Sequence, residues 1–169
     1  MDETLLIRPA DLDDINTIGF LAQQIWPGAY REIISPEQLQ YMLNLFYSPD
    51  SLIKQMIEDR HQFLIVEQRE EAIGFAAWGP AGAGVFKLHK LYVLPGGQRR
   101  GIGRAILLFI FDVIRPEGAT TLRLNVNRAN KAKGFYEKIG FKITGKEDID
   151  IGGGYFMNDF IMECPVPPY

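Results

Sequence analysis

Glycines and arginines gather at residues 98–104, where a predicted strand gives way to a predicted helix. The first turn of a helix leaves backbone N–H groups without partners, and these groups point at any anion placed there. Glycine at positions 101 and 103 lets the backbone approach an anion without a Cβ in the way, and arginine at 99, 100 and 104 adds cationic donors. The spacing predicts a turn that binds pyrophosphate; a tight turn with solvated arginines is the structural alternative.

Two other phosphate-binding motifs fail on this sequence. The dinucleotide fingerprint G-x-G-x-x-G would need glycine at position 106, which is Ile106. The string GFKITGKE at residues 140–147 has the glycine and lysine spacing of a P-loop, but Glu147 stands where serine or threonine should ligate magnesium. Residues 141–143 also alternate as in a strand. Neither a dinucleotide site nor a triphosphatase loop is therefore expected.

Hydrophobic periodicity predicts the elements that must position this turn. Strands are expected at 4–8, 62–67, 72–78, 87–93, 121–126, 141–145 and 155–163, and helices at 11–25, 35–59 with a break near Ser48, 102–114 and 130–139. The order indicates an α/β (α+β) fold, a mixed, mostly antiparallel sheet of about seven strands with four or so helices on its faces. No linker interrupts the sequence, so a single domain over residues 1–169 is expected.

The composition is that of a soluble globular protein. Hydrophobic residues make up 47% and charged residues 23%, and the net charge of −3 gives no footprint for nucleic acid. The one cysteine, Cys164, cannot form an internal disulfide, and the acidic start at Asp2 and Glu3 is unlike a signal peptide. The most apolar run, 105–111, is far shorter than the roughly 20 residues that span a bilayer. A cytoplasmic protein without membrane or nucleic-acid partners is expected.

Two motifs make the chain similar to a known enzyme family. The stretch LYVLPGGQRRGIG, residues 91–103, resembles motif A of the GNAT N-acetyltransferases, in which a strand and a proline precede Q/R-x-x-G-x-G/A. The string NRANKAKGFYEKIGF, residues 127–141, resembles the second signature of the family, and IRPADLDD, residues 7–14, resembles its usual start. The resemblance implies an enzyme that transfers acetyl from acetyl-CoA to an amine, on a sheet splayed between its fourth and fifth strands.

The resemblance also implies which residues hold acetyl-CoA. Backbone groups of Leu91 and Val93 would pair with the pantetheine arm and the acetyl carbonyl. The family asparagine more often lies seven residues before the tyrosine, where this chain has Ala129, so Asn130 and Asn127 are both candidates. The expected cofactor-binding residues are Leu91, Tyr92, Val93, Gln98, Arg99, Arg100, Gly101, Ile102, Gly103, Arg104, Asn127, Asn130, Lys133 and Tyr136. No metal ligands are expected.

Tyr136 matches the family tyrosine that protonates the departing thiolate. A phenol with a pKa near ~10 can protonate or hydrogen-bond a thiolate whose conjugate thiol has a pKa near ~8.5. Many members carry a glutamate base where this chain has Lys87, and His89, on the same strand face, is predicted as the base instead. Glu32, Asp159 and direct attack with proton loss to water are alternatives.

The acceptor side is predicted from the segment between the first two helices, which forms a wall of the acceptor pocket in the family. Trp26, Tyr30 and Glu32 could hold a cationic amine by cation–π contact and charge, although aromatic residues at a helix end can equally be core. Residues 26–49 resemble uncharacterised bacterial members likened to polyamine acetyltransferases. The expected acceptor is a primary amine of a small molecule, attacking directly in a ternary complex. A protein or peptide amine, or a catalytically silent acetyl-CoA-binding sensor, is the alternative, and a homodimer through residues 155–163 is a further hypothesis.

Overall fold

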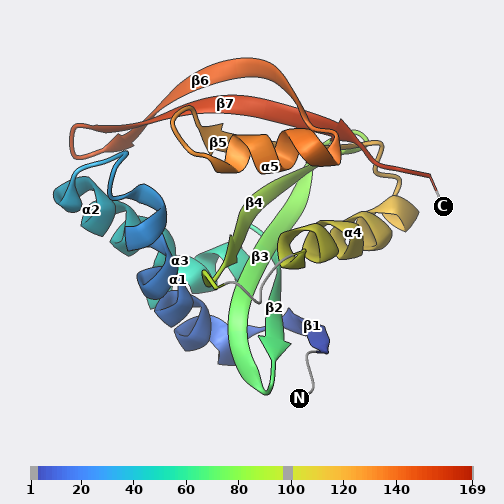
Figure 1. Cartoon of the computed structure of the whole chain (residues 1–169), viewed down its shortest axis with the longest axis horizontal. Coiled ribbons are helices and arrows are strands. Elements are labelled where there is room, and N and C mark those ends of the chain that lie inside the picture. The colour runs from blue at the N-terminus through green and yellow to red at the C-terminus, as the bar shows by residue number, and fades with distance from the viewer. Residues whose placement is uncertain (1–3, 97–100, 169) are drawn as a thin grey trace. The chain divides into compact units, whose positions relative to one another are not determined.

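The computed structural model describes residues 4–96 and 101–168 of the 169-residue chain. The elements are those labelled in Figure 1: β1 (Leu5–Ala10), the short 3₁₀ helix η1 (Leu12–Asp14), α1 (Ile15–Tyr30), α2 (Pro36–Tyr47), α3 (Pro49–Ile57), β2 (Gln62–Gln68), β3 (Glu71–Gly82), β4 (Val85–Val93), α4 (Ile102–Ile114), η2 (Arg115–Glu117), β5 (Thr121–Asn127), α5 (Ala132–Ile139), β6 (Lys142–Gly152) and β7 (Tyr155–Pro165). No helix among these residues is long and apolar enough to cross a membrane.

The described strands form one mixed sheet in the order β1-β2-β3-β4-β5-β7-β6. The pairs β1–β2, β2–β3, β5–β7 and β6–β7 are antiparallel, and the pair β4–β5 is parallel. The parallel register joins Val85–Leu88 to Thr121–Leu124, although β4 runs on to Val93 and β5 to Asn127. The predicted mixed, mostly antiparallel α/β sheet is therefore confirmed, and the β4–β5 register stops where a splay is expected.

The chain divides into two compact units. The first holds β1, η1, α1–α3, β2, most of β3, the end of β4 and the start of α4, and its buried side chains include Ile18, Leu52 and Phe75. The second holds the β3–β4 turn, the start of β4, the rest of α4 and everything from η2 to the C-terminus, with Leu124 and Met162 among its buried side chains. Strands β3 and β4 and helix α4 run from one unit into the other.

Serine caps and prolines determine where helices α2 and α3 of the first unit begin. The Ser35 hydroxyl accepts a hydrogen bond from the Gln38 amide at 3.1 Å, and the Ser48 hydroxyl accepts one from the Ser51 amide at 3.3 Å. Each cap is followed by a proline at the first helical position, where its missing N–H costs nothing. The predicted break near Ser48 is confirmed, and it separates α2 from α3.

The predicted end of the first helix at residue 25 is wrong, because α1 continues through Pro27 to Tyr30. A proline inside a helix removes one hydrogen bond and costs about 3 kcal/mol. Continuing the helix buries Trp26, which is 4% exposed, and Tyr30, which is 9% exposed. Burying each large side chain is worth about 1.5–3 kcal/mol, so packing outweighs the cost of the proline.

Strand β7, which holds the residues of the homodimer hypothesis, lies inside the sheet and not at its edge. Strand β7 pairs with β5 along one edge and with β6 along the other. The chain reverses at Gly152–Gly154, whose φ angles of 86°, 62° and 82° favour glycine, so that β6 lies outside β7. Residues 159–163 of β7 thus have a strand partner on each side, whereas the register with β5 does not extend to residues 155–158.

Candidate functional site

The predicted pyrophosphate turn lies at the start of α4. Gln98, Arg99 and Arg100 fall outside the described residues. Gly101 has a φ of 76°, and its carbonyl accepts a hydrogen bond from the Ala105 amide at 3.0 Å, so α4 begins immediately after it. Ile102 is buried, Gly103 is half-buried and Arg104 is exposed. Among the described residues, no heavy atom lies within 4 Å of a Cβ built on Gly101. The backbone N–H groups at the start of α4 suit the predicted binding of a pyrophosphate.

Gly101 and Gly134 form a matched pair for alanine substitution. Gly134 lies inside α5, and a Cβ there would also meet no heavy atom within 4 Å. We expect Gly134→Ala to raise the free energy of unfolding by about 0.5–1 kcal/mol, since alanine favours helix. We expect Gly101→Ala to lower it by about 1 kcal/mol, since its positive φ strains a side chain. Denaturant unfolding measures both, and changes of the same sign would contradict the prediction.

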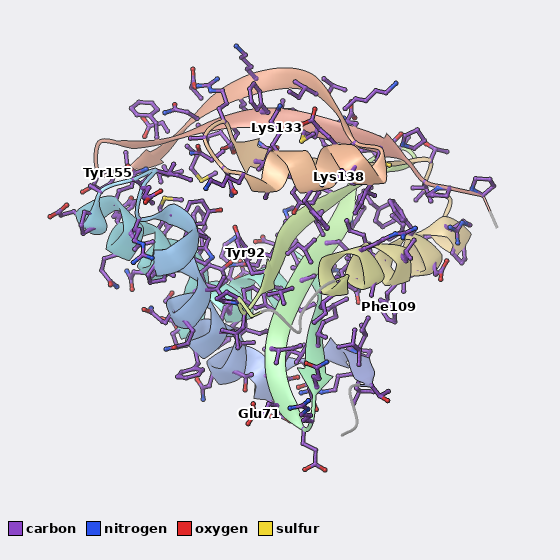
Figure 2. All side chains as sticks on the ribbon, in the orientation of Figure 1. Glu71, Tyr92, Phe109, Lys133, Lys138 and Tyr155 are labelled. Atoms are coloured by element: carbon purple, nitrogen blue, oxygen red, sulfur yellow. The ribbon has the colours of Figure 1, made fainter. Side chains whose placement is uncertain are left out.

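An aromatic cluster in the first unit brings together Trp26 and Tyr30 of α1, Tyr47 of α2, Phe75 of β3 and Tyr92 of β4. The Trp26 ring centroid lies 4.6 Å from that of Tyr30, 5.4 Å from that of Tyr47 and 5.5 Å from that of Tyr92. The hydroxyls of Tyr30 and Tyr92 are hydrogen-bonded at 2.9 Å, and Tyr92 is marked on β4 in Figure 2. Two predicted acceptor residues thus meet the side chain of a predicted cofactor residue.

The third predicted acceptor residue lies apart from the buried rings. Glu32 is exposed in the turn that follows α1. Within the cluster, the buried indole N–H of Trp26 reaches no acceptor at full hydrogen-bond geometry among the described residues. Burial raises the pKa of the Tyr47 hydroxyl well above its ordinary value, and a weaker hydrogen bond from Trp26 acts in the opposite direction.

Lys90 is a buried cation that the sequence interpretation missed. Its Nζ lies 5.3 Å from the ring centroid of Tyr47 and 5.8 Å from that of Phe63. Burial disfavours the charged form and lowers the pKa of Lys90 from 10.5 to about 8. The alternation of β4, in which Phe86, Leu88 and Lys90 are all buried, is the sequence signal that could have placed it.

Tyr136 lies on α5 in the second unit and is 8% exposed. Its ring packs edge-on against Phe135 and Phe141, with centroids 5.1 and 5.5 Å away. Gly140 ends the helix as predicted, with a φ of 125°. The phenol is thus held by packing on both sides.

The turn between β5 and α5 is shaped by the two candidate asparagines. The side-chain carbonyl of Asn127 accepts a hydrogen bond from the Ala129 amide, and that of Asn130 accepts one from the Ala132 amide, each at 2.9 Å. These two bonds use the side-chain oxygens and leave the side-chain N–H groups of both asparagines to donate elsewhere. On α5, Lys133 pairs with Glu137 at 3.2 Å and lies over the Phe160 ring at 5.8 Å; Figure 2 marks it on the helix.

A polar network on the second unit's sheet joins three strands. The Asn125 amide of β5 donates to the Glu147 carboxylate of β6 at 2.9 Å and to the Asp159 carboxylate of β7 at 3.3 Å. Asp159 is only 5% exposed, and burial raises its pKa above the ordinary value, although the hydrogen bond from Asn125 acts in the opposite direction. The sequence interpretation missed Asn125, which the alternation of polar and apolar residues along β5 could have indicated.

Comparison with known proteins gives consistent matches. Residues 30–153 match the family model described as the acetyltransferase (GNAT) domain. The spermidine N(1)-acetyltransferase of Thermoplasma acidophilum is 29% identical over 162 residues, covering 93% of this chain and 94% of that protein. An uncharacterized N-acetyltransferase of Mycobacterium tuberculosis is 26% identical over 152 residues, covering 89% of this chain and 97% of that protein. The crystal structure of PaiA N-acetyltransferase from Thermoplasma acidophilum in complex with coenzyme A has a TM-score of 0.80 at 28% identity, covering 96% of this chain and 99% of that one.

Proposed function

This chain belongs to the GNAT acetyltransferase family, and we propose that it acetylates a primary amine of a small cationic molecule such as a polyamine. The family match over residues 30–153 carries the enzyme class, an acetyl-CoA-dependent N-acetyltransferase. The acceptor class is supported by likeness to a spermidine N(1)-acetyltransferase along 93% of this chain. A net charge of −3 suits a cationic acceptor. We propose that the amine attacks directly while both substrates are bound.

Residues from both sequence motifs are proposed to hold acetyl-CoA. Backbone N–H groups from Gly101 to Arg104 bind the pyrophosphate at the start of α4, because the first turn of a helix leaves these groups without intrahelical partners. Backbone groups of Leu91 and Val93 bind the pantetheine arm, and the amides of Asn127 and Asn130 donate to it. Further proposed contacts are Tyr92, Gln98, Arg99, Arg100, Ile102, Gly103, Lys133 and Tyr136.

Tyr136 is proposed to give the sulfur of CoA its proton. Sulfur gains negative charge as its bond to the acetyl carbon breaks, and a positioned phenol can donate to it at that moment. The packing of the Tyr136 ring between Phe135 and Phe141 supports this role, because a fixed ring keeps the hydroxyl in one place. His89 is the sequence prediction for the opposite task, removal of a proton from the amine.

The aromatic cluster is proposed to form the wall that receives the acceptor. Faces of Trp26 and Tyr30 attract a cation, and the hydrogen bond between Tyr30 and Tyr92 fixes the orientation of both rings. The exposed carboxylate of Glu32 adds negative charge at the end of α1.

The proposal is tested by following CoA release with a thiol reagent. The purified full chain is given acetyl-CoA and a panel of amines: spermidine, spermine, aminoglycosides, free amino acids and short peptides. Turnover with the polyamines is the expected result, and turnover with peptides alone would assign a protein or peptide acceptor instead. The melting temperature with and without acetyl-CoA is measured in parallel, because a ligand that binds the folded state raises it.

Two further results would overturn the proposal in different ways. No turnover, with acetyl-CoA still raising the melting temperature, would indicate a catalytically silent acetyl-CoA sensor. No turnover and no thermal shift would contradict the assigned pyrophosphate turn itself.

We also propose that the chain acts as one domain, since three elements run through both units. We propose that it works in the cytoplasm, since a lone cysteine, Cys164, suits a reducing compartment.

A further inference from the structure

Tyr136 and Asp159 lie on opposite sides of the sheet in the second unit. Helix α5 covers one side: Lys133 contacts the ring of Phe160, and a Cβ built on Gly140 would lie 3.6 Å from the Cys164 sulfur. Side chains alternate along β7, so Phe160 and Cys164 share that side whereas Asp159 points to the other. The ring contact with Phe141 keeps Tyr136 on the α5 side.

The side opposite α5 gathers polar groups from several strands. Asp159 pairs in register with Asn127 of β5 and with Glu147 of β6, and the amide of Asn125 hydrogen-bonds both carboxylates. Leu88 pairs with Leu124, so the next residue of β4, His89, shares the side of Asn125. The polar network around Asp159 therefore lies on the side of the sheet opposite Tyr136.

Acetyl transfer to an amine needs two groups with opposite tasks. An ammonium must lose a proton before its nitrogen can attack, whereas the departing sulfur must gain one. A sheet that keeps the two groups on opposite sides separates the two tasks.

We infer that Asp159 is the proton acceptor for the incoming amine, an inference that rests on the proposed function and on the proposed role of Tyr136. The Asp159 carboxylate takes one proton from the ammonium, and the freed electron pair forms the bond between nitrogen and the acetyl carbon. The bond between that carbon and sulfur breaks, and sulfur takes the hydroxyl proton of Tyr136. The second proton lost by nitrogen restores Tyr136 through water, and Asp159 releases its proton to solvent.

The surroundings of Asp159 make its carboxylate a stronger base than a carboxylate on the surface. Burial raises its pKa, which brings it nearer to that of an ammonium and makes proton transfer less uphill. The charges facing it are Lys87 and Arg128, which lower its pKa, and Glu147, which raises it. Among the described residues, Asn125 is the side chain that hydrogen-bonds Asp159, and it fixes the direction of the carboxylate.

The test compares pH profiles of kcat/KM for the full chain with spermidine. We expect Asp159→Asn to lower kcat/KM about 100-fold near pH ~7, and the deficit to shrink as the pH approaches the acceptor's own pKa near ~10. The free amine needs no base, so high pH replaces the missing carboxylate. The matched control is Glu163→Gln, an acid-to-amide change on the same strand and the same side, where Glu163 pairs with Arg123 at 3.2 Å. Its profile should follow the wild type.

A second variant keeps the inference testable if Asp159→Asn does not fold. Asn125→Ala removes the hydrogen bond that stabilises the charged carboxylate, so the acidic limb of the profile should move to higher pH. A purely structural role for Asn125 would lower activity equally at every pH.

The results that overturn the inference differ from those that overturn the proposed function. An Asp159→Asn deficit that is absent, or the same at every pH, overturns the role of Asp159 alone. A deficit that shrinks with pH in His89→Gln but not in Asp159→Asn assigns the base to His89. Absence of wild-type turnover with every amine of the panel overturns the proposed function and this inference together.

Discussion

Replacing Tyr136 with phenylalanine should lower kcat about 100-fold or more while acetyl-CoA still binds. The substitution removes one hydroxyl and keeps the ring that packs against Phe135 and Phe141. Loss of a positioned proton donor costs about 10²–10⁴-fold in rate, because sulfur must then leave as an unassisted anion. Single-substrate kinetics with the best amine of the panel measure kcat, and the thermal shift with acetyl-CoA measures binding.

Tyr155→Phe is the matched control for Tyr136→Phe. Tyr155 lies in the same unit at the start of β7, beside the turn at Gly152–Gly154 (Figure 2). The same hydroxyl is removed, so kcat should stay within about twofold of the wild type, as a surface change does. A Tyr136→Phe enzyme with wild-type kcat would show that the phenol gives no proton to sulfur.

Replacing Lys90 with methionine should raise the free energy of unfolding by roughly 3 kcal/mol near pH 7. The pKa of Lys90 falls from 10.5 to about 8, a difference of about 2.5 units at about 1.36 kcal/mol each. Methionine has a similar length and carries no charge into the core, and a buried charge replaced by a well-packed apolar group is often stabilising. Contacts of the Nζ with the rings of Tyr47 and Phe63 offset part of the gain.

The pKa shift of Lys90 also predicts how the free energy of unfolding changes with pH. Between about pH 8 and pH 10.5 the unfolded chain holds the Lys90 proton and the folded chain does not. Stability then rises with pH across this window, since the unfolded state binds more protons. Below pH 8 the folded state bears the full cost of burying the charged Lys90 ammonium. Near pH 10.5 this cost has disappeared. Lys90→Met should remove this dependence.

Denaturant unfolding at both ends of the window measures the effect of Lys90→Met. The control is Lys54→Met, at an exposed lysine of α3 that pairs with Asp59 at 3.0 Å. That change should leave most of the pH dependence between 8 and 10.5 unaltered. The hydrogen bond with Asp59 raises the pKa of Lys54, so its contribution to stability is lost mainly as the pH rises above 10.5. If Lys90→Met is less stable than the wild type at pH 7, the buried ammonium stabilises the core and the prediction fails.

The sequence by itself determined the features that depend on neighbours along the chain. Ser35 and Ser48 cap their helices because a hydroxyl reaches an amide three residues away. The glycine turns at Gly101 and Gly152–Gly154 follow from positive φ angles that other residues avoid. The order of strands and helices and the two family motifs were likewise readable from spacing alone, and they were enough for the enzyme class.

Only the tertiary structure decided which distant residues meet. Pro27 is tolerated in α1 because Trp26 before it and Tyr30 after it are both buried. The hydroxyl of Tyr30 is hydrogen-bonded to that of Tyr92, which lies 62 residues away in sequence. Lys90 and Asp159 acquire shifted pKa values because packed segments exclude water from them. Asp159 lies on the side of the sheet opposite Tyr136 because the register of β7 with β5 aligns it with Asn127, on the side away from α5. Local patterns determine elements and turns, whereas burial and register depend on contacts between segments far apart in the chain, which no local pattern encodes.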